Sequence, residues 1–159
     1  MSLPERVAVR DRPPTSIALI LDTFWRDHRE VIAIVLVDGE GECIDYCTSI
    51  DPYAAKVAGA TWLDTTMRIR ARAKHLFAGE LRQWVLETER DAFVIRRVTD
   101  EHVLVVQLVP EGLGARHLAA LDRVVSLLRE DIGADLAAWD CVRDPWIGGS
   151  QRPKPGSAV

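Results

Sequence analysis

The sequence lacks the features that mark membrane, secreted and nucleic-acid-binding proteins. None of its apolar stretches approaches the roughly 20 consecutive residues that span a bilayer, and its charged N-terminus has no apolar segment for export. The formal net charge is -4, so no overall positive field would attract nucleic acid or an anionic membrane. We therefore expect a cytoplasmic protein with no nucleic-acid partner and no membrane partner.

Cysteine is scarce, and no catalytic motif is recognisable. Cys43 and Cys47 lie on a predicted strand about 13 Å apart, at roughly 3.3 Å per residue, which is too far for a disulfide in place. The histidines are scattered, no phosphate-binding loop is present, and no serine has the context of a nucleophile. We expect no catalytic residue, no metal, no cofactor and no enzyme activity.

The apolar pattern predicts an α+β fold with the element order α-β-β-α-β-β-β-α. Helices are expected at about residues 16–28, 52–78 and 113–131, and strands at 31–37, 42–47, 81–88, 92–98 and 102–109. The short links between the last strands require antiparallel pairing. Five antiparallel strands and three helices favour an α/β sandwich, with the long helix on one face and the other two helices on the opposite face.

One domain, residues 15–132, accounts for the predicted core. Residues 1–14 are charged and end in two prolines, so we predict a flexible leader. Gly133 is expected to end the last helix, and residues 133–159 are predicted as a mostly flexible C-terminal extension rich in Pro, Gly and Ser. A short helix that packs Leu136 and Trp139 is an alternative for the start of this extension.

The long helix carries apolar residues on more than one face. At about 100° per residue, one stripe runs its full length and is predicted to face the sheet: Ala55, Ala58, Gly59, Trp62, Thr66, Ile69, Ala73, Leu76 and Phe77. A second stripe holds Ala60, Leu63, Met67 and Ala71. A single domain offers no partner for this second stripe, so we predict a symmetric homodimer through it. An edge with a few exposed small residues is the alternative.

The strand that follows the long helix supports the same prediction. Trp84 and Leu86 lie on one face of it, and Leu81 and Val85 lie on the other. An apolar strand at the edge of a sheet invites pairing with a second copy. We therefore add Trp84 and Leu86 to the predicted dimer interface.

Cations mark the third face of the long helix. Arg68, Arg72 and His75 lie there, with Arg70 and Lys74 beside them. Such a run is either a solvated helix face or a surface for a protein partner, and nucleic-acid binding would need a broader basic surface. We predict a partner surface at Arg68, Arg70, Arg72 and His75.

The order of these elements resembles that of the Roadblock/dynein-light-chain family, with its profilin-like fold. The resemblance covers about residues 15–131. It is carried by VIAIVLVDGEGECIDYC (31–47), by the alanine-rich helix DPYAAKVAGATWLDTTMRIRAR (51–72) and by LVVQLVPEGLGARHLAAL (104–121). No single motif is diagnostic, and the leader and the C-terminal extension have no counterpart in the family core.

The resemblance implies a homodimer formed through the long helix and the third strand. Bacterial members accompany small Ras-like GTPases, and some of them activate GTP hydrolysis, notably those similar to the activator of the gliding-motility polarity switch. In such activators the GTPase docks on the paired long helices and no arginine finger is inserted. The expected function is a homodimeric regulator or scaffold of a small Ras-like GTPase. A small-ligand sensor and a structural subunit of a larger assembly are the alternatives.

Overall fold

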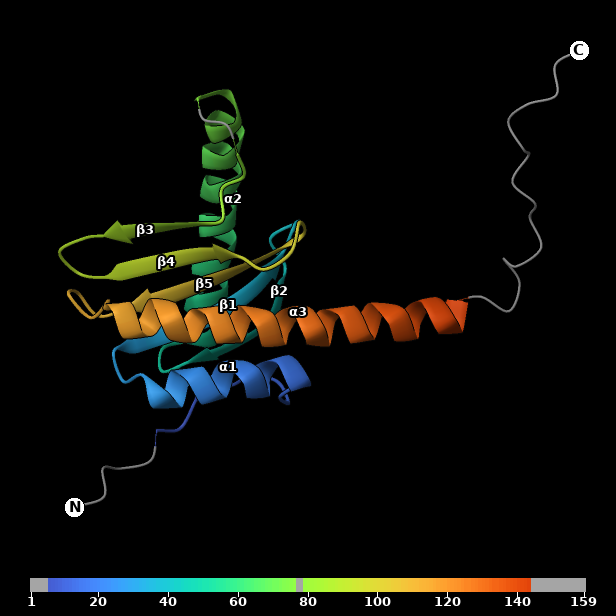
Figure 1. Cartoon of the computed structure of the whole chain (residues 1–159). Coiled ribbons are helices and arrows are strands. Elements are labelled where there is room, and N and C mark those ends of the chain that lie inside the picture. Colours follow the sequence, from blue (N-terminus) through green and yellow to red (C-terminus); the bar gives the residue numbers. More distant parts are fainter. Residues whose placement is uncertain (1–5, 77–78, 144–159) are drawn as a thin grey trace, which may run out of the picture.

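The computed structural model describes residues 6–76 and 79–143, with side chains up to Gly133. These residues form helices α1 (Ser16–Asp27), α2 (Pro52–Leu76) and α3 (Ala115–Arg143) and strands β1 (Val31–Asp38), β2 (Cys43–Thr48), β3 (Gln83–Glu87), β4 (Ala92–Arg97) and β5 (His102–Leu108) (Figure 1). The predicted element order and fold class are confirmed. No helix in the described part of the chain is both long and apolar enough to cross a membrane.

The strands form one antiparallel sheet in the order β2-β1-β5-β4-β3, so β2 and β3 are its edges. The continuous apolar run of β1 suits its interior position, because both of its faces are buried. The turn between β1 and β2 is held by Asp38, whose Oδ1 accepts hydrogen bonds from the backbone N–H groups of Glu40 and Glu42, each over 2.9 Å. Gly41 follows with φ 89°, a conformation that glycine adopts without strain.

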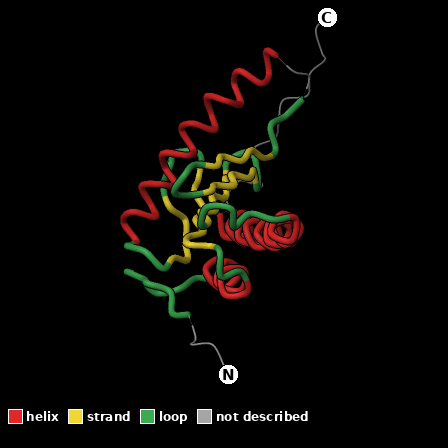
Figure 2. The backbone as a smooth tube through the Cα atoms, turned by 90° about the vertical axis from the view of Figure 1, so that its left-hand side faces the viewer, coloured by secondary structure: helices red, strands yellow, loops and turns green. Residues whose placement is uncertain are grey.

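Each face of the sheet carries its own apolar core. On one face, α1 and α3 pack Leu21, Trp25 and Leu121 against alternate strand residues such as Ile34. On the other face, α2 packs against the second set of strand residues, so that the sheet separates it from α1 and α3 (Figure 2). The predicted division of the helices between the two faces is confirmed.

Caps and one close approach position α1 and α2. The hydroxyl of Thr15 accepts from Ala18 N over 3.3 Å at the start of α1, and Asp51 Oδ2 accepts from Ala54 N over 3.3 Å at the start of α2. Gly59 lets α2 approach β1 closely, because a Cβ atom there would lie 2.9 Å from Val37 Cγ1 and 3.0 Å from Val35 Cγ1.

The predicted end of the last helix at Gly133 is wrong. Helix α3 continues through this residue to Arg143. A glycine inside a helix costs about 1 kcal/mol relative to alanine, and the segment 134–143 contains three alanines and no glycine or proline, which favours a helix. The predicted packing of Leu136 and Trp139, and residues 144–159, lie outside what the structure describes.

Residues 6–12, predicted as part of a flexible leader, are bound to the domain instead. Arg6 donates hydrogen bonds to the carbonyl oxygens of Trp25 (2.7 Å), His28 (3.1 Å) and Val31 (2.6 Å). The backbone N–H of Val9 donates to Thr48 O on β2 over 2.9 Å. This segment therefore belongs to the fold, and residues 1–5 of the predicted leader lie outside the described residues.

Candidate interaction surface

Helix α2 outruns the sheet that it crosses, and its C-terminal end projects past β3 (Figure 1). A helix of 25 residues is about 38 Å long at 1.5 Å per residue, whereas five strands spaced about 4.8 Å apart span only about 20 Å. Leu76, predicted to lie on the sheet, is therefore 72% exposed, which corrects that prediction. Phe77, from the same predicted stripe, lies outside the described residues.

Leu63 was predicted to lie on the second stripe of the long helix and to contact a second copy, and the structure contradicts this. Leu63 is only 5% exposed and packs in the core between α2 and the sheet. The buried residues of α2 are Pro52, Ala55, Gly59, Leu63 and Thr66. The close approach at Gly59 turns this face toward β1, which brings Leu63 onto the sheet. Leu63 is thus a core residue of its own chain and has little surface left for a second copy.

The other three residues of that stripe remain available. Met67 is 47% exposed, Ala71 is exposed, and Ala60 is half-buried. They lie on the flank of α2 beside its sheet-facing residues. A dimer contact through this flank would therefore involve Ala60, Met67 and Ala71.

Trp84 and Leu86 lie on the edge strand β3 and face α2. Both are half-buried and pack against the core between α2 and the sheet. The Trp84 ring contacts Trp62 edge-on with a centroid distance of 5.6 Å. Their packing partners within the chain were not predicted. Their partial exposure on an unpaired edge is what an additional contact with a second copy requires.

The predicted cationic residues divide into two groups. Arg68, Arg72 and His75 are exposed on the projecting half of α2. Arg68 Nε lies 3.0 Å from Asp64 Oδ2, one turn earlier, and such an exposed pair contributes little stability. Neither Arg72 nor His75 forms a side-chain hydrogen bond or an ion pair within the described residues.

Arg70 belongs to the second group, because its charge is neutralised within the chain. Its guanidinium donates to Glu80 Oε2 over 3.1 and 3.2 Å, and Arg97 donates to the same oxygen over 2.9 Å. Burial opposes ionisation of Glu80, but the charge of Lys74 and the hydrogen bond from Arg70 outweigh it, so the pKa of Glu80 is lowered. The predicted partner surface is thereby reduced to Arg68, Arg72 and His75.

One edge strand of the sheet is covered by another segment of the chain, and the other edge strand is not. Residues 9–12 follow the outer edge of β2, where Arg10 donates to Tyr46 O and Arg12 donates to Ile44 O, each over 2.6 Å. The short apolar run Val7-Ala8-Val9, with its two β-branched residues, is the signal of an extended segment that our prediction missed. Edge β3 has no such cover from the described residues, so it is the edge that can accept another strand.

The fully buried carboxylate of Asp45 anchors this cover. It accepts hydrogen bonds from Thr15 Oγ1 over 2.6 Å and from Arg10 Nη2 over 2.7 Å. Burial alone would raise the pKa of Asp45, but the hydrogen bonds from Thr15 and Arg10 outweigh it and lower the pKa. The carboxylate therefore remains ionised and holds the segment against β2.

Metal ligands and thiols are the reactive groups that can be examined in the described part of the chain. The described residues contain no group of three or more His, Cys, Asp or Glu side chains that could hold a metal ion. Cys43 and Cys47 are free thiols. Burial, together with the nearby Asp22 carboxylate, raises the pKa of Cys47 to about 12, which makes this thiol a poor nucleophile.

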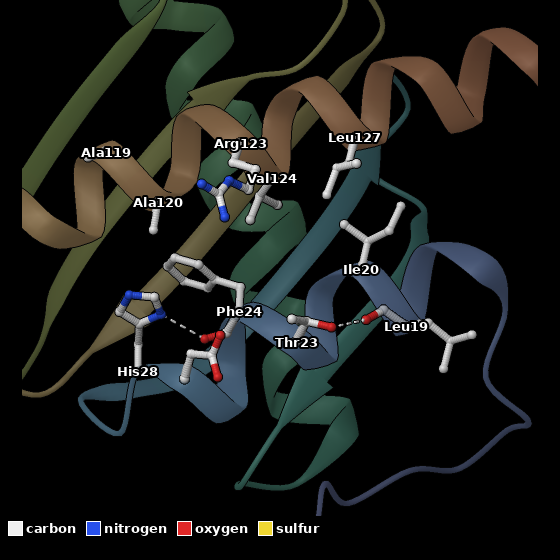
Figure 3. Close-up of a pocket in the computed structure, with 11 residues that line it drawn as sticks. Leu19, Ile20, Thr23, Phe24, His28, Ala119, Ala120, Arg123, Val124 and Leu127 are labelled. Carbon is white, nitrogen blue, oxygen red and sulfur yellow. Dashed lines mark hydrogen bonds between the residues drawn. The ribbon is translucent and has the colours of Figure 1, made fainter.

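A groove of about 720 Å³ lies between α1 and α3 (Figure 3). Its wall includes Leu19, Phe24 and Leu127, and the polar groups of Thr23 and His28 are bonded locally to the carbonyl oxygens of Leu19 (3.0 Å) and Phe24 (2.9 Å). A ligand sensor would need a cavity between sheet and helix with converging polar groups. This groove lies between two helices and does not meet that requirement. A cavity between α2 and the sheet does exist, but at about 80 Å³ it is far smaller than the roughly 300–1,000 Å³ of small-molecule sites.

Solved structures with the same fold include several Roadblock proteins. Myxococcus xanthus MglB superposes with a TM-score of 0.69 at 17% identity, covering 76% of this chain and 97% of that one. A Roadblock/LC7 domain from Streptomyces avermitilis gives 0.65 at 18% identity, covering 72% and 95%. The gliding protein MglB from Thermus thermophilus gives 0.63 at 15% identity, covering 80% and 96%.

No curated protein matches the chain. The family model of the Roadblock/LC7 domain matches residues 18–108, which is more than half of the 159 residues. This range extends from α1 to the end of β5 and includes both α2 and β3. The chain therefore belongs to the Roadblock/LC7 domain family.

Proposed function

We propose that this protein is a homodimeric regulator or scaffold that binds a small Ras-like GTPase in the cytoplasm. The proposal treats it as a binding protein without enzyme activity of its own. Membership of the Roadblock/LC7 family and the similarity in fold to the gliding protein MglB support a role in GTPase regulation. Activation of GTP hydrolysis is one form that this regulation could take, and scaffolding is the other.

The observation that carries the proposal is the projecting half of α2. It exposes Met67 beside the sheet and Leu76 beyond it, and it presents Arg72 and His75 without partners in the described part of the chain. At about 100° per residue, Met67 and Leu76 lie on opposite sides of the helix, with the two cations between them. Methionine and arginine are both enriched at protein interfaces. Arginine is well suited to such a surface, because its guanidinium forms planar pairs with carboxylates.

The two sheet edges support the dimer. Residues 9–12 cover β2, so β3 is the edge left for pairing with a second copy. Trp84 and Leu86 would then lie next to the twofold axis, and the α2 flank with Ala60, Met67 and Ala71 would face its own copy. A pair of α2 helices would present two sets of cations on one surface.

The mechanism follows from this geometry. A paired α2 surface would contact the switch segments of the GTPase and stabilise one of their conformations, because a partner shifts an equilibrium only by its difference in affinity for the two states. Acidic residues beside those switches would match Arg68 and Arg72. The proposal assigns the groups on this surface to binding and gives none of them a part in the chemistry itself.

The test is a pull-down of each Ras-like GTPase encoded in the same genome, combined with its GTP turnover with and without the full chain. We expect one GTPase to bind and its turnover to change. A bound GTPase with unchanged turnover would assign the scaffold role. Absence of binding to every such GTPase would contradict the proposal.

A further inference from the structure

Four arginines surround a second cavity, which the proposed function does not use. This cavity has a volume of about 350 Å³ and is lined by Arg82, Arg96, Arg97 and Arg129. Arg82 precedes β3, Arg96 and Arg97 end β4, and Arg129 lies on α3. The hydrogen bonds from Arg96 to Leu118 O and from Arg129 to Val98 O place the cavity where the last residues of β4 meet α3.

Backbone and side-chain contacts hold three of these guanidinium groups in place. Arg129 donates from Nε to Val98 O over 2.5 Å, which leaves its two terminal amino groups without a partner in the described residues. Arg96 is bonded to Asp122 and lies 3.5 Å from Leu118 O. Arg97 is held from the other side by Glu80 over 2.9 Å and by Asp100 over 3.3 Å.

The cavity has an excess of positive charge. No carboxylate is among its lining residues. Asp122 pairs with Arg96, and Glu80 and Asp100 pair with Arg97, but neither Arg82 nor Arg129 has a carboxylate partner within the described residues. Like charges gathered around one cavity repel one another unless an anion lies between them.

We propose that this cavity binds a small polyphosphate anion of the pyrophosphate class. Guanidinium groups bind phosphate oxygens in a bidentate manner, and two linked phosphoryl groups can use more of the available N–H donors than a single phosphate can. The cavity volume falls at the lower end of the roughly 300–1,000 Å³ of small-molecule sites. The lining contains no aromatic ring on which a nucleobase could stack, so recognition is limited to the phosphates.

The experiment is a calorimetric titration of the full chain with inorganic pyrophosphate at constant ionic strength. We expect saturable binding with one site per chain. Arg129→Gln and Arg82→Gln should each weaken it about tenfold or more, equivalent to about 1.4 kcal/mol. Arg82 is exposed and forms no side-chain hydrogen bond or ion pair in the described chain, so its replacement leaves the fold intact. Asp122→Asn should strengthen binding, because it releases Arg96.

Two controls test whether pyrophosphate binds at this cavity and whether the phosphates alone are recognised. Arg72→Gln removes the same charge from an exposed position outside the cavity and should leave the affinity unchanged. A nucleoside diphosphate should bind no more tightly than pyrophosphate. The inference is overturned by absence of saturable binding, by an equal loss in Arg72→Gln, or by a nucleotide that binds at least about tenfold more tightly than pyrophosphate.

Discussion

The indole Nε1 of Trp84 donates a hydrogen bond to the hydroxyl oxygen of Thr66 over 3.0 Å, and this bond ties the edge strand β3 to helix α2. Thr66 in turn donates to the carbonyl oxygen of Trp62 over 2.6 Å. The two elements of the proposed dimer interface are therefore joined within one chain. A change in one of them would be transmitted to the other.

The bond between Trp84 and Thr66 can be measured with a double-mutant cycle. Thr66→Val leaves the indole N–H without its partner, so we expect the free energy of unfolding to fall by about 1 kcal/mol. Thr61→Val is the matched control, because Thr61 donates only to Val57 O, one turn earlier (2.8 Å). Additive effects of Thr66→Val and Trp84→Phe in urea unfolding would show that the two residues are not coupled.

Gly59 and Gly133 should respond in opposite directions to alanine. A Cβ at Gly59 would lie 2.9 Å from Val37 Cγ1, and such overpacking costs about 1–3 kcal/mol, more than the helix propensity that alanine gains. A Cβ at Gly133 meets nothing within 4 Å, so Gly133→Ala should stabilise α3 by up to about 1 kcal/mol. Thermal unfolding of the two variants checks both signs, and a more stable Gly59→Ala would refute the close approach.

Asp45 should make stability depend on pH in the acid range. Its pKa in the folded state is lowered by Thr15 and Arg10 against the effect of burial, so its contribution is complete above the unfolded value of about 3.9 and is lost as the pH falls through the folded value. Asp45→Asn should cost about 2 kcal/mol at pH 7. The difference from the original chain should narrow below about pH 4. A constant difference in urea unfolding across this range would contradict the assignment.

Much of the fold could be predicted because its signals are local. The β-branched run 31–37, the Asp38-Gly39 turn and the Asp51-Pro52 cap each specify one element by themselves. The antiparallel order then follows from the short links. These features need no knowledge of distant contacts.

The errors arose where tertiary packing decides the outcome. Leu63 faces the sheet because Gly59 allows a close approach to β1, and Leu76 is exposed because α2 is longer than the sheet is wide. Arg70 was predicted to meet a partner but meets Glu80, which lies ten residues later, beyond the end of α2. Arg6 binds three carbonyl groups that no sequence pattern reveals.

The predicted homodimer can be tested by a substitution at Met67. This residue is 47% exposed on the α2 flank, and Met67→Glu would place two like charges near the twofold axis, which should weaken the dimer without disturbing the core. Leu19→Glu is a matched control, because Leu19 is 63% exposed on α1, on the opposite face of the sheet. Light scattering should show a lower mass for Met67→Glu and a dimeric mass for the control Leu19→Glu. A dimeric mass for Met67→Glu would place the interface elsewhere.

The most direct measurement is the affinity of the full chain for a GTP-loaded Ras-like GTPase, compared between Arg72→Glu and Arg123→Glu. Both residues are exposed, but Arg72 lies on the projecting half of α2, whereas Arg123 lies on α3 across the sheet. We predict that Arg72→Glu weakens binding about tenfold or more and that Arg123→Glu leaves it unchanged. Equal affinities for the two variants, or a loss in Arg123→Glu alone, would contradict a GTPase surface on α2.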